Sequence, residues 1–431
     1  MKPRTVDTIL MLLVIVISGN PAVYQVPGGE NAVLTATAVL VGAVAFSRNV
    51  RVFDRRVAAV MAALVAIQLV QCYQLGFWPY LTIVGSLTRL FIAAALVASV
   101  KDFARTYVRA MALLAGYCLV MWSLDQVSLA LGLDFRGLFS PLEQLVGLDG
   151  DHRFALVYTF SVLESTHRNC GVFREPGLFA GYLLLALLLT LIDQGTDAPP
   201  QQRRRRIVLF VAALLSTLST AGYITLPLVA AATAFKHAGQ LRRMVTRKRL
   251  FVGIFVVTVA GLYVVSAQTS FLEDKIQREY DELVEESQNF EITRFGAFVL
   301  DLEAISERPV FGWGLNVETK YALTPELAEL APSGGVTGWM RSFGIAGLLV
   351  FLLAVYASMR TLVADARGAA IYLTAVIVVI AQPNAFLNYP CFLTLMFLGR
   401  RAQDRDQVVA DASSLEDAGQ QMSDADPGNS A

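Results

Sequence analysis

Apolar stretches long enough to cross a lipid bilayer recur along this chain, and they constrain its fold more than any other feature. A helix needs about 20 mostly apolar residues to span the hydrocarbon core, where only helices and closed barrels satisfy their own backbone groups. Hydrophobic residues make up 55% of the 431 residues and charged residues only 16%. The sequence therefore predicts an all-α, polytopic integral membrane protein. The expected crossings are about Val6 to Gly19, Ala32 to Phe46, Val57 to Val70, Pro79 to Val100, Tyr107 to Leu124, Pro176 to Ile192, Leu250 to Ala267, Gly335 to Met359, Ala369 to Ala385 and a short return over Phe386 to Gly399.

Basic residues are concentrated in every second connector between these stretches. The basic connectors are Arg48 to Arg56, Lys101 to Arg109 and Arg203 to Arg206. Because Lys and Arg favour cytoplasmic loops, this pattern predicts that the three connectors and the N-terminus lie inside the cell. The formal net charge is zero, so the distribution indicates an orientation in a membrane and not binding to nucleic acid.

One apolar segment, Ile207 to Phe235, is flanked by basic residues on both sides. Two cytoplasmic flanks require an even number of crossings, so we expect two short helices that turn near Ser219 to Tyr223. The tally is about twelve crossings, with both termini inside and no internal repeat. Residues 1–400 then form one membrane domain with large outer loops over about 125–175 and 268–334, and the polar tail 401–431 is expected to be disordered.

The second outer loop is expected to contain an amphipathic helix over Glu291 to Glu307, which ends at Arg308-Pro309. Its apolar residues recur at helical spacing, which predicts one buried face. That predicted face consists of Ile292, Phe295, Phe298, Val299, Leu302 and Ile305.

A cluster of ionisable residues lies at the mouth of the span that begins near Pro176. Arg168, Arg174 and Glu175 come just before it, and proline is tolerated in the first turn of a helix. Ionisable residues at a membrane are costly unless they are paired or face a polar cavity, so this cluster is a candidate site. The alternative is that these side chains only anchor the helix at the interface.

The order of several motifs resembles the bacterial O-antigen polymerase and O-antigen ligase superfamily, in particular its exopolysaccharide polymerase branch. The first motif is Arg168-x-x-Gly171-x-Phe173-x-Glu175-Pro176-Gly177 before an apolar helix. The others are the Ser/Thr-rich turn Ser216 to Gly222, the block from Thr293-Arg294-Phe295 to Arg308-Pro309-Val310-Phe311-Gly312-Trp313-Gly314, and Ser333-Gly334-Gly335 before Arg341 to Gly347. The chain lacks the arginine that the family often has at the turn, and the His-Asn pair that ligases tend to have at the last helix entry.

The resemblance implies a glycosyltransferase of the C type, in which a membrane domain carries the site on its outer face. Its activity would be to join oligosaccharide units carried on undecaprenyl diphosphate, at the periplasmic face of the inner membrane, with inversion and without a metal or cofactor. Arginine forks match diphosphate oxygens, so Arg168, Arg174 and Arg294 are the candidates that stabilise the leaving group. Glu175 is the first candidate for the base, and its alternative role is as a first-turn acid or N-cap of the helix.

Other side chains are weaker candidates for contact with the substrate. His167 adjoins the first motif, and Tyr223 and Arg341 lie at helix ends; a lone histidine in a loop is often structural. Trp313, Tyr321 and Trp339 could stack on sugar rings, although aromatic residues are common at any membrane interface. Asp149-Gly150-Asp151 spells a metal-binding pattern of sugar transferases, but a turn explains it better on the outer face. The four cysteines lie far apart and indicate neither a disulfide framework nor a zinc site.

Two other functions compete with the polymerase. A ligase would move the finished glycan to another acceptor, and the absent His-Asn pair argues against it. A transporter or flippase would carry the same lipid-linked oligosaccharide across the bilayer, but the chain lacks the repeated halves of many transporters. The partners expected for a polymerase are the lipid bilayer, the lipid-linked oligosaccharide, and a chain-length regulator and flippase of the same pathway.

Overall fold

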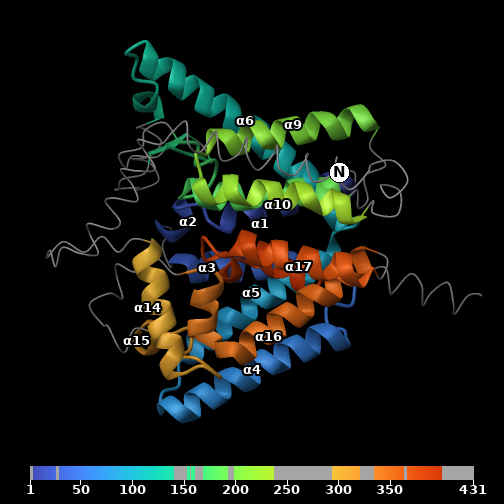
Figure 1. Cartoon of the computed structure of the whole chain (residues 1–431), viewed down its shortest axis with the longest axis vertical. Helices are drawn as coiled ribbons and strands as arrows, with labels where there is room; N and C mark the ends of the chain where they lie inside the picture. Colours follow the sequence, from blue (N-terminus) through green and yellow to red (C-terminus); the bar gives the residue numbers. More distant parts are fainter. Residues whose placement is uncertain are drawn as a thin grey trace, which may run out of the picture.

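The computed structural model describes residues 3–25, 29–139, 153–155, 157–160, 168–192, 199–236, 294–320, 334–363 and 366–399. Within these ranges the chain is mostly helical, as Figure 1 shows, and it contains five helices long and apolar enough to cross a membrane. Three shorter apolar helices lie beside them. The prediction of an all-α membrane protein is therefore confirmed at this level.

The first half of the chain forms helices at each stretch where the sequence predicts a span. They are α1 (Pro3–Ile17), the short α2 (Ala22–Gln25), α3 (Gly29–Ser47), α4 (Arg55–Leu75), α5 (Tyr80–Ser99) and α6 (Phe103–Ala130). The start of α4 is fixed by Asp54, whose side chain accepts a hydrogen bond from the Val57 N–H at 2.8 Å. It ends at Gly76, which adopts the left-handed conformation that glycine tolerates best.

The predicted first outer loop contains elements that the sequence did not indicate. A 3₁₀ turn, η1 (Arg136–Phe139), follows α6, and β1 (Arg153–Ala155) pairs antiparallel with β2 (Tyr158–Phe160). Tyr158 and Phe160 are buried, so their rings anchor this hairpin against the helices. The chain then enters α8 (Pro176–Leu191), with Pro176 in the first turn as expected.

The apolar segment between two basic flanks is a helical hairpin, as its charges predict. It consists of α9 (Pro200–Ser216) and α10 (Thr220–Lys236), and the turn between them lies over 217–219. The last part of the described chain contains α14 (Arg294–Glu307), α15 (Val317–Lys320), α16 (Val336–Leu362) and α17 (Arg367–Ala381).

The expected final crossing over Phe386 to Gly399 is not a continuous helix. It consists of η3 (Phe386–Asn388), α18 (Pro390–Leu393) and η4 (Thr394–Met396), which are mostly buried against the other helices. Broken backbone is tolerated at membrane depth when protein covers it, and Pro390 favours a new start. Leu250 to Ala267 and the tail 401–431 lie outside the described residues.

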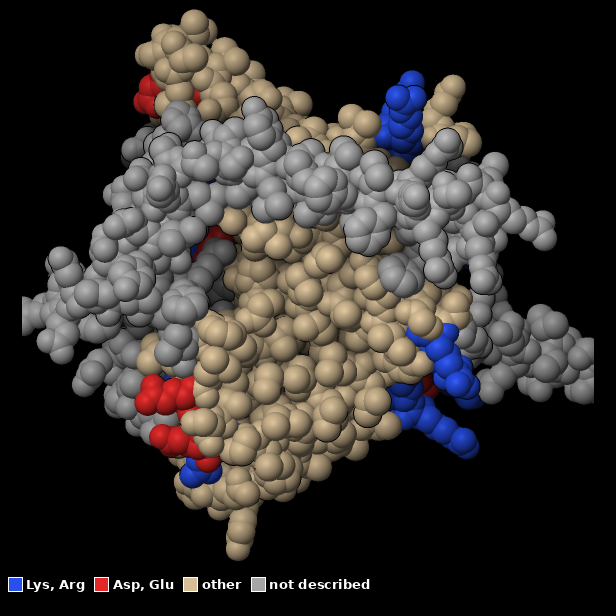
Figure 2. Space-filling model, in the orientation of Figure 1, with Lys and Arg blue, Asp and Glu red and all other residues tan. Residues whose placement is uncertain are grey.

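The basic ends of the helices meet at one end of the bundle. Arg48 at the end of α3 donates to the Asp7 carboxylate in α1 and to the Ser99 carbonyl at the end of α5. Arg56 in α4 donates to the Ala354 carbonyl near the end of α16. Figure 2 shows the Lys and Arg side chains mostly at the right of the view and the acidic ones mostly at the left. This segregation is what the alternating basic connectors predict.

The helix α16 is broken at Gly344, where the backbone leaves the helical conformation with φ +65°. Residues 309–314 fill the break: the N–H groups of Trp313 and Gly314 donate to the carbonyls of Arg341 and Ser342 at 2.8 and 2.9 Å. A Cβ at Gly344 would lie 2.2 Å from the Val310 carbonyl oxygen, so this close approach requires glycine. Two motifs that are distant from each other in the sequence thus form one joint.

The buried face of α14 agrees with the predicted one in part. The helix ends at Glu307 and Ile305 is buried, both as expected, but Leu302 is 47% exposed, whereas Asp301 and Ala304, which are outside the predicted face, are buried. The apolar pattern alone could not reveal the burial of Asp301, because this carboxylate is stabilised by partners from another helix. Those partners, Thr337 and Arg341, belong to α16.

Candidate functional site

The loop 168–175 is held rigidly between α1 and the α9–α10 hairpin. The Asn20 side chain at the end of α1 donates to the Val172 carbonyl at 2.9 Å. The Asn169 side chain donates to the Ser216 hydroxyl at 2.9 Å and accepts from the Gly171 N–H, also at 2.9 Å. Residues 169–173 are buried, so this segment is fixed before any ligand binds.

Two of the predicted arginines flank this buried segment. Arg168 is partly exposed, and its Nε donates to the Thr217 carbonyl in the hairpin turn at 3.2 Å. The Arg174 backbone N–H donates to the Gly19 carbonyl at 3.0 Å, while its side chain is exposed. The fold therefore fixes the main chain and leaves both guanidinium groups at the edge of the bundle.

Glu175 occupies the N-cap position of α8, but its side chain makes no capping hydrogen bond to the described helix start. With the Asn384 amide nitrogen turned toward it, Asn384 donates to Glu175 Oε2 at 3.1 Å. The position agrees with the N-cap alternative, while the carboxylate faces the segment that follows α17. Its assignment as a base stays a prediction.

Tyr223 lies beside Arg168 at the turn of the hairpin. Its hydroxyl donates to the Leu215 carbonyl at 2.7 Å, and its side chain is almost fully buried. Arg168 is close enough to interact electrostatically with this hydroxyl. The structure thus brings two of the predicted residues together.

Arg341 and Trp313 lie in the joint between α14 and α16. Arg341 is 3% exposed; its Nε and Nη2 donate to the Lys320 carbonyl at 2.9 and 2.6 Å, and its Nη1 lies 3.4 Å from Asp301. Trp313 donates from its ring nitrogen to the Ala304 carbonyl, and the Arg308 guanidinium lies over its ring at 4.5 Å. Both side chains support the fold of this region, whatever else they contact. His167, Tyr321 and the side chain of Arg294 lie outside the described residues.

A polar cavity of about 440 Å³ lies between α3, α4, α5, α16 and the segment 385–393. Its volume is within the usual range for ligand pockets, about 300–1,000 Å³. The charged and polar side chains that line it are Glu30, Asn31, Gln68, Thr82, Ser86, Arg89, Lys320 and Asn388. The aromatic ones are Trp339, Phe343 and Tyr389. Of the predicted substrate contacts whose side chains are described, Trp339 is among these lining residues, whereas Tyr223, Arg341 and Trp313 are not.

Arg89 is the residue of this cavity that sequence reasoning missed. It lies inside the apolar span α5, and its Nη2 forms an ion pair of 2.6 Å with Glu30 at the start of α3. A single arginine within an otherwise apolar span is a signal of function, because an intramembrane charge is costly without a polar partner or cavity.

Lys320 is a second cationic residue that lines the cavity, outside the spans, and the Asp301 carboxylate interacts with it electrostatically. Burial lowers the pKa of Lys320 to about 8, partly offset by the neighbouring Asp301 carboxylate. Burial raises the pKa of Asp301, while the Thr337 hydroxyl, Lys320 and Arg341 act in the opposite direction. A cation held in a partly dehydrated site interacts strongly with a bound anion.

Among the described residues, no group of three or more His, Cys, Asp or Glu side chains is placed to hold a metal ion. Comparison of the chain with models of known protein families and with curated proteins finds no match.

Proposed function

We propose that this protein is a membrane glycosyltransferase that polymerises oligosaccharide units carried on undecaprenyl diphosphate. In this proposal it acts at the periplasmic face of the bacterial inner membrane, without a metal, and inverts the anomeric carbon. The motif order from Arg168 to Gly347 supports it, together with the all-α membrane fold.

The observation that carries the proposal is the rigid loop 168–175. It presents Arg168, Arg174 and Glu175 at the mouth of α8 and contacts Asn20 just after α1, on the side opposite the start of that helix, where Arg48 pairs with Asp7. Under the positive-inside rule that side is the outer one, where lipid-linked units are polymerised. Two arginines on one short loop suit a diphosphate, because each guanidinium fork can donate two parallel hydrogen bonds to its oxygens.

The chemistry follows from charge development at the leaving group. A hydroxyl of the acceptor sugar attacks the anomeric carbon of the donor, the bond from that carbon to the diphosphate oxygen breaks, and Glu175 takes the hydroxyl proton. Arg168 and Arg174 stabilise the negative charge that grows on the diphosphate, which lowers the barrier more than it tightens substrate binding. Arg341 positions the joint of α14 and α16 through Lys320 and Asp301.

The test is polymer formation by purified protein in liposomes that contain one lipid-diphosphate-linked repeat unit. We expect a ladder of products that persists with EDTA, and its loss in Arg168→Ala and in Glu175→Ala. Arg367→Ala is the matched control, because this exposed arginine starts α17 at the basic end of the bundle.

Three outcomes would contradict the proposal. Transport of labelled glycan across the bilayer without a new bond would establish the transporter. Transfer of a single glycan to a separate acceptor, without lengthening, would establish the ligase. A ladder that disappears with EDTA would show that the reaction needs a metal.

A further inference from the structure

The polar cavity is lined by two cationic side chains, Arg89 and Lys320, that have no role in the function proposed for the loop 168–175. Arg89 is held within the membrane span α5, and Lys320 approaches from the outer joint. The Arg89 Nε is buried and has no hydrogen-bond partner among the described residues. The ring nitrogen of Trp339, a residue 5% exposed that lines the cavity, is also buried without a described partner. Buried donors without partners are costly, so the wall of the cavity contains polar groups that the described protein does not satisfy.

The charge of the lining favours an anion. Among the described lining residues, Arg89 and Lys320 are cationic and Glu30 is acidic; Glu30 pairs with Arg89, and Asp301, which does not line the cavity, interacts with Lys320. Gln68 and Ser86 add neutral polar groups and are joined by a hydrogen bond of 3.2 Å. Phosphate oxygens next to an aromatic wall fit this combination, since Trp339 and Tyr389 offer faces for a sugar ring.

The cavity and the loop 168–175 share one wall, the segment 384–389. Asn384 contacts Glu175 on one side, whereas Ala385, Asn388 and Tyr389 line the cavity on the other. Glu175 therefore contacts the same segment that lines the cavity.

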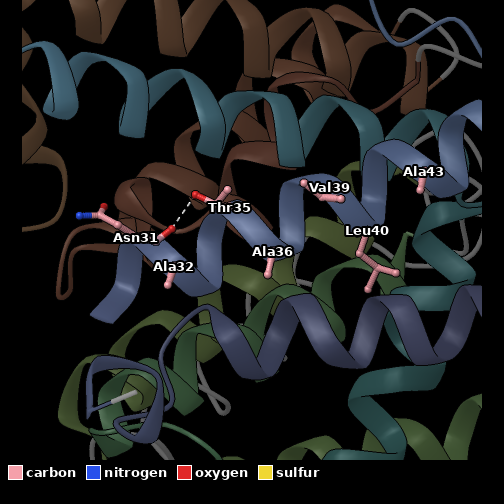
Figure 3. Close-up of a pocket in the computed structure, with 7 residues that line it drawn as sticks. All are labelled: Asn31, Ala32, Thr35, Ala36, Val39, Leu40 and Ala43. Carbon is pink, nitrogen blue, oxygen red and sulfur yellow. Dashed lines mark hydrogen bonds between the residues drawn. The ribbon is translucent and has the colours of Figure 1, made fainter. Parts of the chain in front are cut away.

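The cavity adjoins a shallow groove along the exposed face of α3. Asn31 lines both the cavity and a shallow groove whose other residues are Ala32, Thr35, Ala36, Val39, Leu40 and Ala43. Figure 3 shows that these side chains lie along α3 for most of its length, and three of them are alanines. A hydrocarbon chain attached to a headgroup in the cavity would pass Asn31 and lie on this face.

We propose that this cavity binds the diphosphate of a second lipid-linked unit, the acceptor, and that the groove on α3 holds its polyprenyl chain. The inference rests on the proposed function, because a polymerase that retains the glycan on lipid must hold two carriers at once. The donor diphosphate lies at Arg168 and Arg174 and leaves as polyprenyl diphosphate when its bond to the anomeric carbon breaks. The acceptor hydroxyl loses its proton to Glu175, and the lengthened glycan stays on the carrier in the cavity.

The test is the number of polyprenyl diphosphate molecules, without sugars, that the full-length protein binds in nanodiscs, counted by native mass spectrometry. We expect two per chain for the wild type. We expect one for Arg89→Gln with Lys320→Gln, and one for Arg168→Ala with Arg174→Ala. If the double variant does not fold, Lys320→Gln alone tests the cavity, because it keeps the Arg89–Glu30 ion pair. This single variant should weaken one of the two binding events at least tenfold. Arg55→Gln, exposed at the basic end of the bundle, is the control and should bind two.

A second arm tests the groove. Ala36→Phe should weaken binding of the undecaprenyl carrier at the cavity but not of a short farnesyl diphosphate, which does not reach along α3. Leu113→Phe on the exposed face of α6 is the matched control. Inorganic diphosphate and phosphatidylglycerol should each fail to displace the carrier from the cavity.

The inference is overturned if the wild type binds a single carrier, if the cavity variants still bind two, or if phosphatidylglycerol displaces the carrier. The assay needs no bond formation, so it is independent of the proposed activity. A protein that makes polymer but binds one carrier refutes only this inference, and a protein that binds two but makes no polymer refutes only the proposed function.

Discussion

Replacement of Arg341 by methionine tests whether this predicted substrate contact is a structural residue. The side chain donates twice to the Lys320 carbonyl and lies 3.4 Å from Asp301, with both charged groups 3–4% exposed. Loss of one partner of a buried ion pair costs about 3–5 kcal/mol, because the remaining charge is left uncompensated. Lys320 still acts on Asp301 in the variant, so we expect the lower end, about 3 kcal/mol.

The free energy of unfolding can be measured by circular dichroism during titration of the purified protein with SDS. Arg341→Met with Asp301→Asn should be more stable than Arg341→Met alone, because no bare carboxylate remains. Arg367→Met, at an exposed helix start, should change stability by no more than about 0.5 kcal/mol. A loss of stability under about 1 kcal/mol in Arg341→Met would contradict a structural role for Arg341. A loss in the double variant equal to the sum of the losses in Arg341→Met and in Asp301→Asn would contradict the coupling of the two residues.

Three further predictions use the same measurement or the polymerisation assay. Gly344→Ala should destabilise the protein by at least about 1–2 kcal/mol, because Gly344 has a positive φ. Gly116→Ala, inside α6 with open space where its Cβ would lie, should be neutral or stabilising. Equal effects of the two substitutions would show that the close contact of Gly344 with Val310 does not require glycine. Burial in the folded protein lowers the pKa of Lys320 to about 8, so above that pH the unfolded chain binds more protons at this residue than the folded protein does. The free energy of unfolding should therefore rise from about pH 8 to 10, and this rise should be absent in Lys320→Met. Asn20→Ala should reduce polymer formation at least tenfold while the protein stays folded, since Asn20 fixes the loop at Val172; unchanged activity would show that the loop needs no such support.

The sequence predicted the helices well because their physical causes are local. Among the described residues, the predicted apolar spans before the last one appear as helices close to their predicted ends, and the segment Ile207 to Phe235 with its two basic flanks is a helical hairpin as expected. The predicted span Leu250 to Ala267 lies outside the described residues. The final crossing was wrong as a helix. Its residues are apolar enough for a span, but the backbone forms three short helical elements packed against the surrounding helices instead of one continuous helix.

The candidate site was predictable only in part. The loop 168–175 could be recognised as a candidate site from the sequence, because charged residues directly before an apolar span that begins with proline are unusual. The structure adds the hydrogen bonds that hold this loop in place. The cavity has no contiguous signal in the sequence, because its lining comes from six separate parts of the chain, within 30–31, 64–68, 81–90, 315–320, 339–343 and 385–393.

By itself, the sequence determined the class of protein, the positions of its spans and the end of the bundle at which basic residues gather. These three properties depend on the free-energy cost of moving charges and unsatisfied backbone groups into lipid. That cost is set by the residues of each segment, independently of the other segments. Only the tertiary structure decided that Asp301 and Arg341 are buried together, that Gly344 and Val310 form a joint, and that Arg89 faces a cavity. Those properties are contacts between segments that are distant in sequence, so no local pattern contains them.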